Sequence, residues 1–124
     1  QTNDRGWVRW QGTDATITID LGKDAPIKRV TAGFFHETVR SVFPPPQVEV
    51  SVSTDGTTFT RVALLTQPSP VKTPRPEVRT FIAAMEGVHA RYVRLTATSA
   101  GATPEWHKRA GEPSWLFADE IIVE

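Results

Sequence analysis

The sequence predicts an all-β protein built as an antiparallel sandwich of two sheets. Apolar and polar residues alternate strictly along several segments, and only a repeat of two residues places successive side chains on opposite faces of a sheet. No segment combines a helical apolar stripe with capping residues. About seven short segments of the alternating kind are separated by glycine and proline, which favours a sandwich or a barrel.

The clearest predicted strands are residues 15–21 and residues 47–53. Every second residue is apolar in the first, and three valines alternate with polar residues in the second, so each is expected to bury one face. Other segments rich in β-branched and aromatic residues suit a pleated surface. These predicted strands are residues 27–35, 58–65, 77–84, 91–98 and 115–123. The expected core residues are Ile17, Ile19, Val48, Val50, Val52, Val93 and Leu95.

Three connections stand out between these strands. Asp55 and Gly56 tolerate the positive φ angles of a tight turn, so residues 47–65 are predicted to form a β-hairpin. Residues 67–76 carry four prolines and are expected to form a surface loop. Residues 99–114 are long for a hairpin connection and concentrate aromatic and charged residues, which is typical of a functional loop.

Composition excludes several classes of function. The 124 residues suffice for one domain with one core, and 14 basic residues balance 14 acidic ones. A neutral chain has no field to gather nucleic acid or an anionic membrane, so neither is an expected partner. No cysteine is present, and no apolar run approaches the roughly 18 to 20 residues of a membrane span.

Five motifs, in order along the chain, resemble those of one known family. They are WVRWQGTD at residues 7–14, ITIDLG at 17–22, VEVSVSTDG at 48–56, ARYVRL at 90–95 and WLFADEI at 115–121. Together they cover nearly the whole chain and resemble the discoidin modules, also called factor V/VIII type C domains. The resemblance implies a jelly-roll sandwich of the galactose-binding-domain type, as a single module spanning residues 1–124 without the usual first strand and loop.

Residues 104–107 and 115–120 are most similar to modules at the C-terminus of bacterial β-hexosaminidases, which are grouped with the family-thirty-two carbohydrate-binding modules. The resemblance implies a non-catalytic, monomeric accessory module of a secreted, periplasmic or cell-surface glycoside hydrolase. Its implied partners are the parent's catalytic domain and a glycan ending in galactose or N-acetylgalactosamine. The alternative is an interaction domain that packs on the catalytic domain and has no affinity for sugar.

A sugar site needs an exposed aromatic ring beside polar groups, because the ring stacks on the apolar face of a pyranose. Trp106, in the long loop, is the leading candidate, and Trp10 is expected in a neighbouring loop. Galactose-binding relatives grip hydroxyl groups with histidine and arginine from comparable loops. That resemblance makes His36, Arg40 and His107 the polar candidates, although each also suits a structural role.

The sequence also bears on a metal site and on a catalytic site. Relatives hold a structural calcium beside the glutamate of the closing strand, so Glu120 with Asp4 is the expected metal pair. Calcium takes about six to eight oxygen ligands, and Glu120 instead facing solvent or an arginine is an equal alternative. Catalysis is disfavoured, since the carboxylates are scattered singly and no nucleophile or phosphate-loop motif exists. The three histidines also lack the close spacing of a zinc site.

Overall fold

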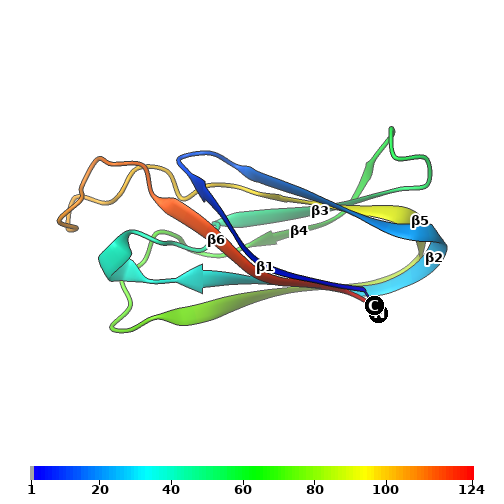
Figure 1. Ribbon diagram of the computed structural model, residues 1–124, viewed down its shortest axis with the longest axis horizontal. Coiled ribbons are helices and arrows are strands. Elements are labelled where there is room, and N and C mark those ends of the chain that lie inside the picture. The colour runs from blue at the N-terminus through cyan, green and yellow to red at the C-terminus, as the bar shows by residue number, and fades with distance from the viewer. Residues whose placement is uncertain (1) are drawn as a thin grey trace.

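A computed structural model describes the backbone of residues 2–124 and the side chains from residue 11 onward (Figure 1). The chain forms antiparallel strands and one short 3-10 helix. They are β1 (Thr2–Gln11), β2 (Ala15–His36), η1 (Thr38–Arg40), β3 (Gln47–Ser53), β4 (Thr60–Thr66), β5 (Glu77–Ala97) and β6 (Trp115–Val123). The prediction of an all-β fold is confirmed.

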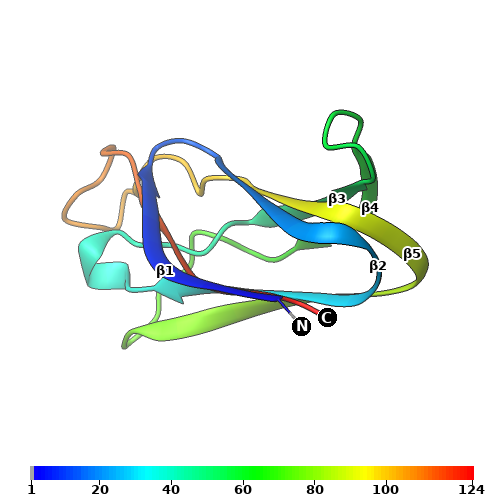
Figure 2. The same cartoon turned by 45° about the vertical axis from the view of Figure 1, so that its right-hand side comes forward.

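The strands form one continuous sheet in the order β1-β6-β2-β5-β3-β4, and this sheet folds over on itself into two layers. The first half of β2 pairs with the second half of β5, beside β3 and β4. The remaining halves of β2 and β5 pair with each other beside β6 and β1. Figure 2 shows both long strands curving from one layer into the other. The predicted antiparallel two-layer sandwich is therefore confirmed.

The bend corrects the predicted strand boundaries. Residues 15–21 and 27–35 were expected as separate strands, but they are two halves of one bent strand. The pairing shifts register between Asp20 and Ala25, and Gly22 there takes a φ of +84°, which a residue with a side chain rarely adopts. Residues 77–84 and 91–98 are joined across a similar bend in β5. Interrupted alternation thus marked a corner of the sheet, where a loop was expected.

An ion pair ties the two strands together at this bend. Arg91 donates through Nε and Nη2 to the two carboxylate oxygens of Asp20, at 2.8 and 3.0 Å. These bonds and a backbone N–H from Gly22 hold the pKa of Asp20 below its ordinary value. The fork of two parallel bonds fixes the relative position of β2 and β5 where the backbone ladder is interrupted.

The core lies between the two layers. Of the seven predicted core residues, all are buried except Ile17, which is partly buried and packs against the others. The rings of Phe34 and Phe81 meet edge to face, with centroids 5.8 Å apart. Leu116 and Ile121 of β6 close the same core from the second layer.

The predicted hairpin is also confirmed, with Asp55 and Gly56 at its turn. The Asp55 carboxylate accepts N–H bonds from Thr57 and Thr58 at 2.8 and 2.9 Å. These bonds, with one from the Ser53 hydroxyl, lower the pKa of Asp55 to about 2. An ionised aspartate therefore organises the turn across the whole physiological pH range.

Candidate functional site

Three connections that are far apart in the sequence meet at one end of the sandwich, on the left in Figure 1. They are residues 37–46 after β2, residues 67–76 between β4 and β5, and residues 99–114 between β5 and β6. Because β2, β5 and β6 are neighbours in the sheet, their ends bring these connections together. The tertiary fold thus assembles a surface from both loops that the sequence singled out.

Thr38 links the other two connections to η1. Its hydroxyl oxygen accepts the backbone N–H of Thr73 at 2.9 Å and lies 3.1 Å from the Thr73 hydroxyl. Its carbonyl oxygen accepts the Nε2 hydrogen of His107. The Thr38 side chain is 8% exposed, so water competes little for these bonds. One residue therefore sets the separation of residues 67–76 and residues 99–114.

Ser41 provides a second attachment for the long loop. Its backbone is left-handed, with a φ of 58°, and its hydroxyl is hydrogen-bonded to the Thr103 hydroxyl. The Ser41 carbonyl accepts the N–H of Trp115, the first residue of β6. The 99–114 loop is consequently held at its base as well as at His107, which gives its tip a defined position.

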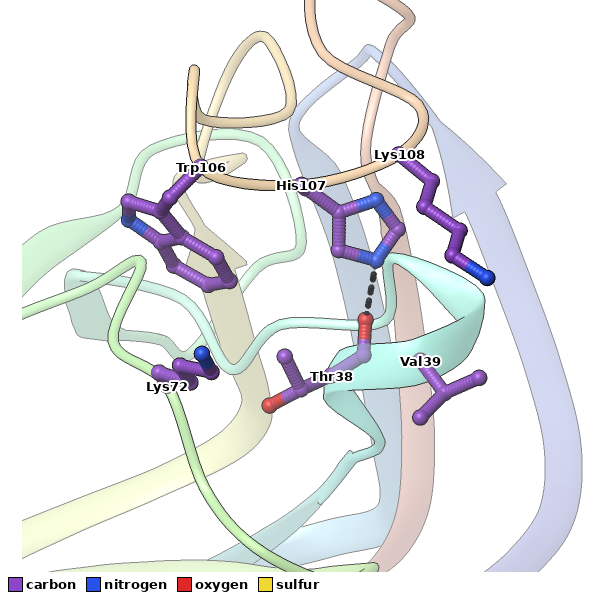
Figure 3. A pocket seen from close by; sticks show the side chains of 6 residues that line it. All are labelled: Thr38, Val39, Lys72, Trp106, His107 and Lys108. Carbon is purple, nitrogen blue, oxygen red and sulfur yellow. Dashed lines mark hydrogen bonds between the residues drawn. The ribbon is translucent and has the colours of Figure 1, made fainter.

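The three connections enclose a hollow of about 250 Å³ (Figure 3). It is lined by Thr38, Val39, Lys72, Trp106, His107 and Lys108. Trp106 is 47% exposed and Val39 is 81% exposed, so two apolar surfaces face solvent at this hollow. Figure 3 shows the indole on one side and Val39 on the other, with the bonded pair of His107 and Thr38 between them. The hollow combines a ring face, an aliphatic wall and amines.

The Trp106 ring packs against the protein core and is also half exposed to solvent. Its ring meets Phe43 edge to face, with centroids 6.2 Å apart, and Phe43 is fully buried. The Lys72 ammonium lies 5.8 Å from the indole centroid. The ring is therefore held by Phe43, half exposed to solvent and faced by a lysine, and an exposed ring beside a polar group is what ring stacking requires. Of the predicted site residues whose side chains the structure describes, Trp106 and His107 are the two that it brings into this hollow.

Both ring nitrogens of His107 are already occupied. Nδ1 accepts the backbone N–H of Arg109 at 2.9 Å, while Nε2 is bonded to the Thr38 carbonyl, which can only accept. The ring is therefore the neutral tautomer with its hydrogen on Nε2. In this state neither nitrogen is available to grip a hydroxyl group. His107 holds the loop in place and offers the hollow its carbon edge.

The expectation that His36 is an accessible polar contact is wrong. The imidazole is 0% exposed, because it packs 5.6 Å from the Phe43 ring beneath the 67–76 loop. Its Nε2 lies 3.0 Å from the Val71 carbonyl, and its Nδ1 lies 3.6 Å from a Glu77 carboxylate oxygen. Burial lowers the pKa of His36, although the Val71 carbonyl and Glu77 partly oppose this. His36 therefore supports the site from inside.

Arg40 does not line the hollow. The Arg40 side chain is 74% exposed and forms a 3.4 Å ion pair with Glu37, the residue just before η1. Trp10 was expected in a loop, but its backbone belongs to β1 and pairs with Leu116 of β6. The side chain of Trp10 lies outside the described residues.

Sequence reasoning missed Val39 and Lys72. Lys72 stands in the proline-rich connection, where nothing in the pattern distinguishes it from a solvated loop lysine. Val39 is an exposed valine on a helix of three residues, which is too short for a recognisable repeat. Their role follows from the meeting of the loops, which no local signal reports.

The predicted calcium pair cannot be tested from the side chains that the structure describes, because only Glu120 is among them. From residue 11 onward, no three His, Asp or Glu side chains are grouped so that they could hold a metal ion. Glu120 lies in β6 between Gly33 of β2 and Arg5 of β1, and Asp4 pairs in register with Ile121. The Asp4 side chain is outside the described residues. Calcium binding at Glu120 and Asp4 therefore stays a prediction.

Comparison with known proteins places this geometry in a family. No curated protein sequence matches the chain. Among solved structures, the CBM32 module of AlyQ in complex with 4,5-unsaturated mannuronic acid has a TM-score of 0.59 at 17% identity, covering 94% of this chain and 74% of that one. Chitosan-binding module 1 of a chitosanase/glucanase from Paenibacillus sp. IK-5 has a TM-score of 0.52 at 18% identity, covering 89% and 73%.

A third similar structure is a CBM32 module from Clostridium perfringens, CpGH89CBM32-5, in complex with GalNAc-β-1,3-galactose. Its TM-score is 0.50 at 15% identity, and the match covers 90% of this chain and 74% of that chain. At these identities the likeness establishes the fold. The family model described as F5/8 type C domain matches residues 1–116. The chain therefore belongs to the F5/8 type C, or discoidin, domain family.

Proposed function

We propose that this domain is a non-catalytic carbohydrate-binding module that receives a sugar ring in the hollow beside Trp106. The observation that carries the proposal is a half-exposed indole, fixed edge to face on Phe43, at a hollow of about 250 Å³. That volume suits about one pyranose, and stacking on an aromatic ring stabilises such a contact. The sugars named for similarly folded modules support the same class of ligand.

A terminal galactose or N-acetylgalactosamine is the first neutral ligand to test, because it was expected from the family resemblance. A single shallow site of this kind gives weak affinity, with a Kd on the order of 0.1 to 1 mM. The parent protein is proposed to be a secreted, periplasmic or cell-surface glycoside hydrolase. Among the residues that the structure describes, no helix is both long and apolar enough to cross a membrane.

The test is a glycan array with the isolated domain, followed by titration of each positive sugar into the Trp106→Ala variant. Loss of binding with a Tm lowered by only a few degrees is the expected result, since one aromatic contact contributes about 1 kcal/mol. The substitution Leu64→Ala, at an exposed residue of β4 that does not line the hollow, is the matched control and should keep full affinity. No binding of any glycan at millimolar concentration would overturn the proposal.

The second candidate is an interaction domain that packs on a neighbouring catalytic domain. One observation favours it: Val78 and Ile82 are exposed on the first half of β5, the edge of its layer. Exposed apolar side chains along an edge suit burial against another domain. If Val78→Ser and Ile82→Ser release the parent's catalytic domain in a pull-down while glycan binding is absent, this candidate replaces the first.

A further inference from the structure

We infer that the hollow beside Trp106 is adapted to a sugar that carries a carboxylate, that is, a uronic acid residue. This inference rests on the proposed function and names the ligand class of the same site. It starts from the charge of the lining. Two of the six lining residues are lysines, and none of the six, all in the described part of the chain, is acidic.

The two lysines lie at opposite ends of the hollow. Lys72 reaches it from the 67–76 connection and Lys108 from the 99–114 loop, on either side of the bonded pair of His107 and Thr38 (Figure 3). The Lys72 ammonium is 5.8 Å from the centroid of the Trp106 ring. Because this ammonium lies over the ring, a pyranose that stacks on the same face packs beside the Lys72 side chain and brings its substituents within reach of the amine.

The same geometry argues against the hydrogen bonds to a neutral sugar that were expected from the sequence. Those bonds relied on histidine and arginine side chains holding adjacent hydroxyl groups. His36 is fully buried, and both His107 nitrogens are engaged within the protein. The remaining side-chain donors that line the hollow are the two ammonium groups, the Trp106 indole N–H and the buried hydroxyl of Thr38. Ammonium groups discriminate in favour of a carboxylate over a hydroxymethyl group.

The charge of the hollow is a local feature. The chain has a formal net charge of +0, so a general attraction of anions to the whole protein does not arise. The nearest acidic residues in the sequence, Glu37 and Glu105, do not line the hollow, and Glu37 is paired with Arg40. At physiological ionic strength charges act over about 8 Å, so the two lysines that line the hollow act on a bound sugar at the shortest range.

Galactose and galacturonic acid provide the matched ligands for a test. They differ only at C6, where a hydroxymethyl group is replaced by a carboxylate. Methyl galactoside, methyl galacturonoside and the neutral methyl ester of the latter are titrated into the domain at low and at high sodium chloride. The carboxylate form is expected to bind about three- to tenfold more tightly than both neutral forms at low salt. High salt should largely remove that difference.

Variants that remove the lysine charges test whether the preference for a carboxylate arises in the hollow. Lys72→Met and Lys108→Met together should bring the galacturonoside affinity down to that of the neutral sugars measured on the same variant, so that the ratio between the two falls to about one. The matched control is Lys23→Met with Lys28→Met, which removes the same charge from exposed positions of β2 that do not line the hollow. The control pair should keep the preference.

The outcomes separate this inference from the proposed function. If the neutral galactoside binds as tightly as the galacturonoside, or if the control pair loses the preference as well, the inference is wrong while sugar binding stands. If none of the three ligands and no glycan on the array binds, both are wrong. If acetate competes as strongly as the galacturonoside, the lysines form an anion site without sugar selectivity, and the inference is again overturned.

Discussion

The imidazole of His107 donates its Nε2 hydrogen to the backbone carbonyl of Thr38, which joins two loops that are 69 positions apart in the sequence. This bond determines where the neighbouring Trp106 and Lys108 stand, because both belong to the loop that it restrains. The second His107 bond, to the Arg109 N–H, prevents the ring from turning. The binding surface therefore depends on a side chain whose nitrogens face inward.

Replacing His107 tests this dependence. His107→Ala removes both bonds and leaves the Thr38 carbonyl with only the N–H of Ser41, so the free energy of unfolding should fall by about 1 to 2 kcal/mol. Sugar affinity should fall as well, since the loop that carries Trp106 loses its restraint. Urea unfolding and ligand titration measure the two effects. An unchanged affinity with reduced stability would show that the base of the loop, at Ser41 and Thr103, positions Trp106 without His107.

The buried His36 predicts a dependence of stability on pH. Burial lowers the pKa of His36 in the folded state, so the unfolded chain binds the proton more readily. Stability is therefore full above the ordinary histidine value of about 6.5 and is lost as pH falls below it. Tm should decline between about pH 6.5 and pH 5, and less steeply in His36→Gln. An NMR titration that finds His36 with a pKa at or above its ordinary value would contradict the prediction.

Calcium binding stays a prediction that a melting experiment decides. If Asp4, Glu120 and backbone carbonyls complete a site, added calcium should raise Tm. A calcium concentration one hundred times Kd should increase the free energy of unfolding by about 2.7 kcal/mol. Glu120→Gln should remove that gain, and Glu112→Gln, an exposed loop residue, should keep it. Identical melting curves with calcium and with chelator would instead exclude a functional site.

The turn between β3 and β4 offers a test of local geometry. Gly56 has a φ of +79°, and an added Cβ would lie 3.1 Å from the Tyr92 ring. Gly56→Ala should therefore destabilise by about 1 to 2 kcal/mol. Gly22→Ala shares the positive φ but has open space around the added Cβ, so it should cost less. Equal losses in the two variants would mean that backbone strain alone accounts for the effect.

Much of the fold was predictable from residues close together in the chain. The alternation in residues 47–53 placed Val48, Val50 and Val52 in the core, and Asp55 with Gly56 marked the hairpin, because both signals act over a few residues. The bends in β2 and β5 were read as loops. Alternation stops at a sheet corner as it does at a strand end, and the sequence pattern does not distinguish the two.

The candidate site was predictable only in part. Trp106 stood out because it is a large aromatic residue in a long polar loop, where it is not part of the apolar face of any predicted strand. His36 and His107 looked equally suitable as sugar contacts, and burial of the first and the two bonds of the second could not be inferred from their neighbours.

Local periodicity and turn chemistry were thus sufficient for an antiparallel sandwich with a valine-rich core, since each depends on interactions within a few residues. The composition of the hollow required the whole fold. Lys72 and Trp106 come from connections 34 positions apart, yet an ammonium and an indole lie 5.8 Å from each other. That proximity arises because neighbouring strands of the folded sheet end at the same place, and strand order is a property of long-range pairing.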